Sequence, residues 1–270
     1  MSQDPNQEPL VRLDVSGGLA VVTLNRPRAY NAINLLLAES LVDILIRCDE
    51  DRQVRAVLVT GAGPAFCSGG DIRQMQEYVA RDGDGGRFLK SLTVYLHAAI
   101  TTISHMQKPV VMAVNGPAAG AGFSLAIAGD LLLAAETATF TVAYTAIALS
   151  PDGGSTFHLP RLIGPKLAFE LASSNRRLSA TEARDLRIVS KVFAADQFLA
   201  EATAYASALA CGPTEALSRA KRLIATGTEN TLETQMEYER QAIGACGRTA
   251  DFKVGVTAFL EKRVATYHGR

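Results

Sequence analysis

The chain has 270 residues, of which 48% are hydrophobic and 20% are charged, so it can build a sizeable core in one large domain or two small ones. Lys plus Arg and Asp plus Glu both number 27, which gives a formal net charge of zero. A neutral chain without a Lys/Arg run lacks the basic surface that binds nucleic acids or anionic membranes, so neither partner is expected.

Short β-branched runs predict strands, and apolar residues at helical spacing between them predict helices. The strands predicted in the first half of the chain span residues 19–24, 56–60, 109–115 and 130–134. The helices predicted between them span residues 34–49 and 88–106. Residues 81–87 (RDGDGGR) are rich in Gly and Asp and predict a mobile surface loop. Strands that alternate with helices indicate an α/β core with few hairpins.

Helices dominate the sequence pattern after Pro160. Ser179 and Glu182 form a capping-box pattern that opens a helix. The helices predicted after it span residues 196–211, 213–226, 231–245 and 249–263. Apart from a strand-like run at 188–193, no strand is predicted beyond about position 165. We therefore expect an α/β core over residues 1–195 that holds the functional site, followed by a helical region over residues 196–270.

The cysteines and the N-terminal segment indicate a cytoplasmic protein. Cys48, Cys67, Cys211 and Cys246 form neither a C-x-x-C pair nor a zinc-finger pattern, which is typical of reduced thiols that bind no metal. Residues 1–18 are polar and acidic, unlike a signal or transit peptide. No apolar stretch is long enough to cross a bilayer, so no membrane segment is expected.

Two glycine-rich segments each follow a predicted strand and lead toward a helix, at residues 61–71 (GAGPAFCSGGD) and 115–125 (NGPAAGAGFSL). Small residues let a ligand approach the backbone, and a helix N-terminus presents unpaired N–H groups. Two such turns could converge on one oxygen, as an oxyanion hole requires. Tight helix–strand packing explains either segment alone equally well. Phosphate binding fits poorly, because Leu125 stands where G-x-G-x-x-G needs its third glycine and no P-loop motif occurs.

Four short motifs follow one another along the chain. They are NRP at 25–27 with Asn31, AFCSGGD at 65–71, NGPAAGAG at 115–122 and PDGG at 151–154. Together they resemble the enoyl-CoA hydratase/isomerase (crotonase) family. The match runs in register from about Val11 to residues 250–263, so it covers nearly the whole chain. Within that family, the PDGG turn and the C-terminal segment are especially similar to the epoxyphenylacetyl-CoA isomerases of phenylacetate breakdown.

The resemblance implies an α/β fold of the crotonase (ClpP-like) type, a spiral of strand–strand–helix turns with a helical C-terminal trimerisation region. It implies an acyl-CoA thioester as substrate, with no metal or redox cofactor. It also implies a homo-oligomer, either a trimer or a dimer of trimers.

By position, the resemblance assigns the two oxyanion donors to the backbone N–H groups of Ser68 and Ala121. Further residues that it places around the substrate are Cys67, Gly69, Gly70, Asp71, Ile72, Gly120, Ser124, Tyr144 and His158. It assigns contacts with coenzyme A to Arg28 and, from a neighbouring subunit, to Phe259 and Lys262, although Lys262 is equally an ordinary solvated residue.

The family's hydratases deliver water with two glutamates, whose positions fall here on Ser124 and Tyr144. Neither side chain is a carboxylate, and an unactivated hydroxyl is a poor general base. Asp152 stands where the family's isomerases and dehalogenases place their catalytic carboxylate. An Asp before Gly-Gly-Ser-Thr can instead cap the following helix, but the resemblance favours catalysis here. Capping is the favoured reading for Asp71, which opens a predicted helix.

A hydrolase is a rival reading, because Ser124, Asp152 and His158 occur in the order Ser, Asp, His, and GFSLA at 122–126 is one residue from G-x-S-x-G. Two features oppose it: Ser124 does not follow its strand directly, and Asp152 and His158 are not at helical spacing. A lone histidine in an apolar stretch more often packs in the core or lines a pocket.

The sequence therefore predicts an acyl-CoA isomerase that shifts a double bond, or opens a ring epoxide, through a thioester enolate held in an oxyanion hole. In this prediction Asp152 takes one proton and returns it elsewhere on the acyl chain. Enoyl-CoA hydratase is the alternative enzyme. A non-catalytic acyl-CoA-binding or scaffold protein is the alternative of another class.

Overall fold

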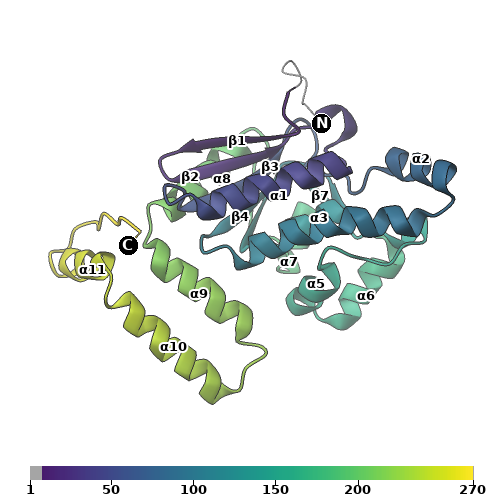
Figure 1. Ribbon diagram of the computed structural model, residues 1–270. Helices are drawn as coiled ribbons and strands as arrows, with labels where there is room; N and C mark the ends of the chain where they lie inside the picture. Colours follow the sequence, from purple (N-terminus) through teal and green to yellow (C-terminus); the bar gives the residue numbers. More distant parts are fainter. Residues whose placement is uncertain (1–7, 270) are drawn as a thin grey trace.

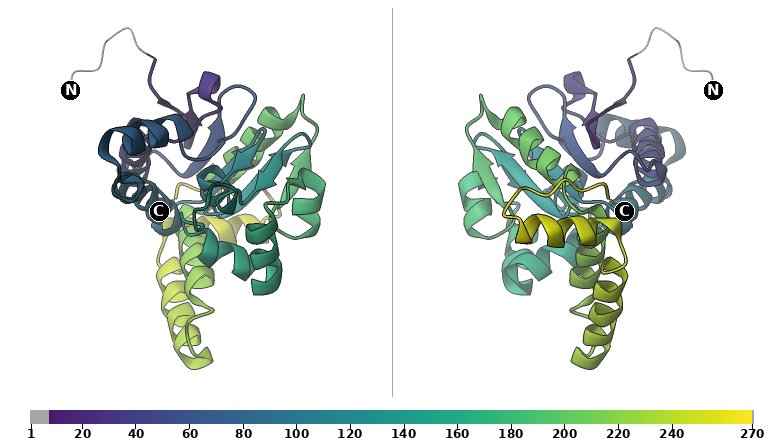
Figure 2. Two further views of the ribbon diagram at one scale, coloured as in Figure 1. Left: turned by 90° about the vertical axis from the view of Figure 1, so that its right-hand side faces the viewer. Right: turned by 90° about the vertical axis from the view of Figure 1, so that its left-hand side faces the viewer.

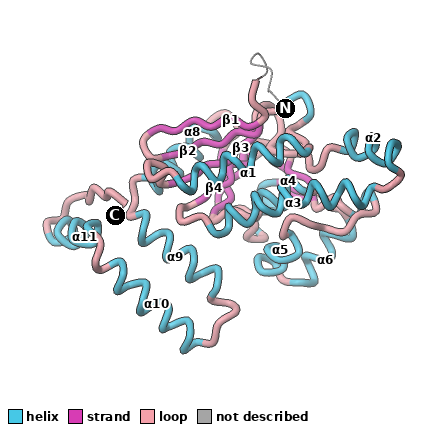
Figure 3. The backbone as a smooth tube through the Cα atoms, in the orientation of Figure 1, coloured by secondary structure: helices cyan, strands magenta, loops and turns pink. Residues whose placement is uncertain are grey.

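The computed structural model describes residues 8–269 (Figures 1 and 3). The prediction made for residues 1–18 lies outside the described residues over positions 1–7. The elements are, in chain order, β1 (Val11–Ser16), β2 (Leu19–Leu24), η1 (Pro27–Ala29), α1 (Leu35–Glu50), β3 (Ala56–Gly61), α2 (Ile72–Asp82), α3 (Gly85–His105), β4 (Val110–Val114), β5 (Ala118–Ala119), α4 (Ala121–Ala126), β6 (Leu131–Ala135), β7 (Thr139–Thr141), η2 (Thr145–Ile147), α5 (Ser155–Ile163), α6 (Pro165–Ser174), β8 (Leu178–Ser179), α7 (Ala180–Asp185), β9 (Lys191–Phe193), α8 (Phe198–Ala210), α9 (Thr214–Thr226), α10 (Leu232–Cys246) and α11 (Ala250–Leu260). No helix among residues 8–269 combines the length and the hydrophobicity that a transmembrane span requires.

The larger sheet has the strand order β1-β2-β3-β4-β6-β9. β1 pairs with β2 as an antiparallel hairpin, and the other neighbours in this sheet are parallel. β4 is buried along its whole length, and β3 along all but its last residue. Parallel strands that are buried on both faces consist of continuous apolar runs, which is why these strands stand out in the sequence. The four strands predicted in the first half correspond to β2, β3, β4 and β6.

Different helices cover the two faces of this sheet. Val57 and Val59 of β3 pack into the core shared with α1 and α3, whereas Ala56 and Leu58 pack against α8. α8 presents Phe198 and a row of buried alanines, and small side chains let a helix lie close to a sheet. The three layers hold β3 and β4 rigidly, so the turns at their carboxyl ends start from fixed points.

The smaller sheet has the order β5-β7-β8 and connects the two glycine-rich turns. β5 lies in the second turn, and its Ala118 bridges to Cys67 in the first. The N–H of Gly120 donates to the carbonyl of Thr141 at 3.1 Å. This sheet therefore brings the start of α4 next to the segment that leads to Tyr144.

The last three helices, α9 to α11, extend away from the sheets (Figures 1 and 2). They carry apolar side chains that are at least 74% exposed, at Ile224, Ile243, Phe259 and Leu260. α8 belongs to the region predicted from residue 196 onward, yet it packs on the larger sheet. The helical extension proper therefore begins with α9.

The predicted loop at 81–87 is wrong, because only two residues separate α2 from α3. Gly83 has a φ of 70° and ends α2 in the left-handed conformation. The Asp84 side chain accepts hydrogen bonds from the N–H groups of Gly86 and Arg87 and begins α3. Glycine and aspartate act here as adjacent helix caps.

The region after position 165 contains two strands where one strand-like run was predicted. That run at 188–193 corresponds to β9, whereas β8 was missed because it has two residues. The predicted capping box is confirmed: Ser179 accepts from the N–H of Glu182, and Glu182 accepts from the N–H of Ser179.

Candidate active site

The two glycine-rich turns lie against each other, as the sequence predicted. The N–H of Cys67 donates to the carbonyl of Pro117 at 3.2 Å, and the N–H of Ala119 donates back to the carbonyl of Cys67 at 3.0 Å. A Cβ added to Gly122 would lie 2.2 Å from the Cys67 carbonyl oxygen, so this position accepts only glycine. Burial raises the pKa of the Cys67 thiol to about 12, which leaves it neutral and unreactive.

Ala121 is the first residue of α4, and its N–H has no hydrogen-bond partner among residues 8–269. Gly69 lies beside it, since a Cβ added there would be 3.6 Å from the Ala121 nitrogen. The N–H of Ser68, the other predicted donor, donates to the carbonyl of Tyr30 at 3.0 Å. A thioester oxygen between the two turns would share the Ser68 N–H with Tyr30 or replace that carbonyl.

Asp71 caps α2, which matches the favoured reading of its sequence context. Its carboxylate accepts from the N–H groups of Arg73 and Gln74 and pairs with the Arg26 guanidinium at 2.9 Å. Ile72, the next residue, is exposed. The sequence showed Arg26 only as part of the NRP motif and gave it no role, because its partner Asp71 is 45 positions away. These contacts fix the start of α2 beside the first turn.

Asp152 does not cap the helix that follows it. α5 begins at Ser155 with Gly154 as its N-cap, and no side chain accepts from its first N–H groups. The carboxylate Oδ1 accepts a hydrogen bond from the Tyr144 hydroxyl at 2.5 Å. The backbone carbonyl of Asp152 is held by the N–H of Ser155 at 3.1 Å and by its hydroxyl at 2.8 Å. Asp152 is half-buried.

Ser124 and Tyr144 lie side by side, with their hydroxyl oxygens 2.8 Å apart. Both are buried, and the Ser124 hydroxyl also lies 3.3 Å from the carbonyl of Gly120. Burial and the nearby Asp152 carboxylate raise the pKa of Tyr144 above its ordinary value, so the phenol stays protonated. A chain of hydrogen bonds therefore runs from Asp152 to the first turn of α4.

Two histidines flank the turn that carries Asp152. His97 of α3 accepts a hydrogen bond from the N–H of Gly153 through Nε2, at 3.3 Å. His158 is half-buried beside Gly154, and burial together with the charge of Arg161 lowers its pKa, which favours the neutral ring. Sequence reasoning missed His97, because no motif links it to a turn that lies 56 positions away.

The hydrolase reading finds no support in these contacts. Among the hydrogen bonds of residues 8–269, none joins the His158 ring to Ser124 or Asp152, so the proton relay of a catalytic triad is missing. Within the same residues, no group of three His, Cys, Asp or Glu side chains is arranged to hold a metal ion.

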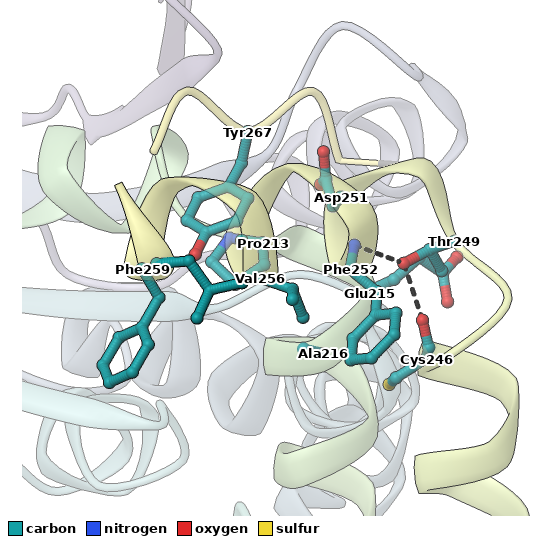
Figure 4. Close-up of a pocket in the computed structure, with 12 residues that line it drawn as sticks. Pro213, Glu215, Ala216, Cys246, Thr249, Asp251, Phe252, Val256, Phe259 and Tyr267 are labelled. Carbon is teal, nitrogen blue, oxygen red and sulfur yellow. Dashed lines mark hydrogen bonds between the residues drawn. The ribbon is translucent and has the colours of Figure 1, made fainter. Parts of the chain in front are cut away.

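The residues predicted to contact coenzyme A belong to two different regions of the single chain. Arg28 is exposed in η1. Phe259 lies on α11 and Lys262 just beyond it, far from α5 (Figure 1). Phe259 borders a groove of about 390 Å³ between α9, α10 and α11, lined also by Phe252 and Tyr267 (Figure 4). That groove includes neither the glycine-rich turns nor Asp152, so the coenzyme A contacts stay predictions.

Comparison with known proteins agrees with this geometry. The sequence model of the Enoyl-CoA hydratase/isomerase family matches residues 14–270. A Rhodobacter capsulatus protein named as a probable enoyl-CoA hydratase is 37% identical over 264 residues, which cover 96% of this chain and 98% of that protein. The 1,2-epoxyphenylacetyl-CoA isomerase of Escherichia coli is 36% identical over 256 residues, covering 95% of this chain and 97% of that one.

A solved structure shows the same architecture. An enoyl-CoA hydratase/isomerase structure from Mycobacterium abscessus superimposes with a TM-score of 0.92 at 31% identity, covering 96% of this chain and 100% of that one. The arrangement of sheets and helices over almost the whole chain is thus that of a known fold family. The chain belongs to the enoyl-CoA hydratase/isomerase family and has the crotonase fold.

Proposed function

We propose that this protein is an acyl-CoA isomerase, which shifts a double bond or opens a ring epoxide through a thioester enolate. One observation carries the proposal: among the hydrogen bonds of residues 8–269, Asp152 is the one carboxylate joined to the Ser124–Tyr144 pair, which occupies the two positions where the family's hydratases carry glutamates. One carboxylate suffices to carry one proton between two carbons.

The proposed reaction begins at the thioester carbonyl. The N–H groups of Ala121 and Ser68 polarise its oxygen and stabilise the negative charge that develops there. Asp152 removes a proton from the carbon next to the carbonyl of a 3-enoyl thioester, and the C–H electron pair moves into the enolate. When the enolate collapses, the same proton is returned to a carbon further along the acyl chain. No water is added, so one base is enough.

Hydratase is the second candidate, favoured by the name of the Rhodobacter capsulatus relative. Hydration requires one group that activates water and another that protonates carbon. Ser124 and Tyr144 offer hydroxyls at these positions, and the raised pKa of Tyr144 keeps its hydroxyl protonated. The Escherichia coli relative supports the isomerase instead, and it extends the substrate class to cyclic acyl groups with an epoxide.

The test compares two reactions in two proteins. We expect the wild type to interconvert 3-enoyl- and 2-enoyl-CoA, or a cyclic analogue, faster than it hydrates crotonyl-CoA. Asp152→Asn keeps the shape but cannot accept the proton, so isomerisation falls by about 10²–10⁴-fold. Turnover is followed in deuterated water, which reports proton exchange at carbon.

Asp185→Asn is the matched control, because Asp185 is an exposed carboxylate on α7 whose one ion pair within residues 8–269 is with Arg184. Its turnover should equal that of the wild type. Efficient hydration by the wild type would favour the hydratase, and wild-type isomerisation by Asp152→Asn would exclude Asp152 as the base.

A further inference from the structure

We infer that Tyr144 is a positioning residue for Asp152. Its hydroxyl donates a hydrogen bond to Oδ1 of the carboxylate, so that Oδ2 is the atom that carries the proton. This inference rests on the proposed role of Asp152 as the proton carrier. It assigns to Tyr144 a role different from contact with the substrate.

The direction of the hydrogen bonds follows from the chemistry of the three groups. An ionised carboxylate has no proton to donate, so the Tyr144 hydroxyl must be the donor in its 2.5 Å contact with Asp152. Its single proton is then engaged, so Ser124 is the donor in its 2.8 Å contact with Tyr144. The other acceptor open to Ser124, the carbonyl of Gly120, is further away at 3.3 Å. This hydrogen-bond relay therefore runs from the Ser124 hydroxyl through the Tyr144 hydroxyl to the Asp152 carboxylate.

The relay fixes a side chain that the rest of the turn leaves free. The backbone of Asp152 is fixed by Ser155, and the next peptide is held by His97. Among the hydrogen bonds of residues 8–269, only Tyr144 donates to the carboxylate. Without that donor, rotation about the terminal bond of the side chain would exchange the two oxygens.

Tyr144 is well placed to act as a fixed donor. It is 8% exposed, its N–H donates to Val142, and its carbonyl accepts from Ile147 and Leu149. Burial and the adjacent charge raise its pKa, so it remains a donor when Asp152 is ionised. A proton shuttle must reach two carbons from one position, and displacement of a reacting group by about 1 Å can lower a rate about 10²-fold.

Tyr144→Phe tests the inference, because it removes the hydroxyl and keeps the ring. We expect kcat for isomerisation to fall by about 10- to 100-fold with KM nearly unchanged, since the lost group does not touch the substrate. Site-specific replacement of Tyr144 by 3-fluorotyrosine keeps the hydroxyl and should retain most of kcat. Tyr205→Phe, which removes a hydroxyl on α8 away from the site, should leave both constants unchanged.

A double-mutant cycle separates positioning from other roles. In the Asp152→Asn background, Tyr144→Phe should cause no further loss, because the group that it positions has already lost its function. The inference would be overturned if the kcat loss of the double variant equalled the product of the two single losses. It would also be overturned if Tyr144→Phe changed KM instead of kcat, or changed neither constant. Circular dichroism checks folding, and Ser124→Ala provides a second variant, which removes the donor to Tyr144 and should lower kcat by a smaller factor.

The same cycle distinguishes this inference from the proposed function. If Asp152→Asn is inactive and Tyr144→Phe is fully active, only the positioning role fails. If Asp152→Asn isomerises at the wild-type rate, Asp152 is not the base and the positioning role fails with it, while the isomerase function stands. If the wild type hydrates crotonyl-CoA faster than it isomerises, the proposed function itself fails.

Discussion

The N–H group of Ala121 belongs to the first turn of α4, where no helical carbonyl can accept from it. Proline removes this donor, yet its ring is tolerated at the first position of a helix. We expect Ala121→Pro to lower isomerase turnover by about 10²–10³-fold, the usual effect of losing one oxyanion donor. Steady-state kinetics with an enoyl-CoA substrate would measure the loss.

The control for this variant is Ala250→Pro, since Ala250 is likewise the first residue of a helix, α11, away from the site. It should fold and turn over substrate like the wild type. A folded Ala121→Pro protein with undiminished turnover would show that this N–H does not stabilise the enolate.

Two aspartates show how much of the site the sequence could determine. Asp71 and Asp152 each stand near a predicted helix start, and capping is a reasonable expectation for both. Asp71 caps α2, whereas Asp152 lies two positions before the N-cap of α5 and is held by Tyr144. The exact residue at which a helix begins decides between these roles, and sequence periodicity does not define it that closely. The family resemblance favoured catalysis over capping for Asp152; the structure excludes the cap, and catalysis stays a prediction.

At the scale of elements, the start of α2 depends on Asp71. Asp71→Ala removes the cap and leaves the partly buried Arg26 without its carboxylate. We expect the free energy of unfolding to fall by about 1–2 kcal/mol. The melting temperature should fall by about 2–4 °C for each kcal/mol, as measured by differential scanning calorimetry.

Asp84→Ala is the matched control, because Asp84 caps α3 in the same way and forms no ion pair with any residue between positions 8 and 269. Its loss should stay near 1 kcal/mol, the value of a cap alone. Equal losses in the two variants would mean that the Arg26 contact contributes nothing to stability.

Long elements whose apolar residues recur at a regular spacing could be predicted from the sequence, whereas short elements could not. α1, α3 and α8 to α11 each repeat their apolar residues over several turns, and β3 and β4 are continuous apolar runs. β5 and β8 have two residues each, too few to show an alternation, and their pairing depends on contacts distant in the chain. β5 nevertheless joins the two glycine-rich turns, so part of the site rests on a strand that the sequence pattern does not reveal.

For the whole molecule, we predict a homotrimer or a dimer of trimers that buries the apolar side chains of α9 to α11. Ile224 and Ile243 are 78% and 74% exposed in the single chain, more than an isolated subunit normally leaves in water. Light scattering at micromolar protein should give at least three times the mass of the 28.7 kDa chain. Ile243→Glu should lower that mass, and a Val15→Glu control on the edge hairpin should not. A monomeric wild type would contradict the prediction.

The site combines contacts of very different span along the chain, and this has a consequence for folding. The relay from Ser124 through Tyr144 to Asp152 joins residues 20 and 8 positions apart. The two glycine-rich turns, which hold the proposed oxyanion donors, are joined over longer distances, as in the contact of Asn115 with Gly63 across 52 positions. Closing a longer loop carries a larger entropic penalty, so nearby contacts tend to form first. Tyr144 and Asp152 are therefore expected to come together before the two turns do, so the proposed enolate site would be the last part of the site to form during folding.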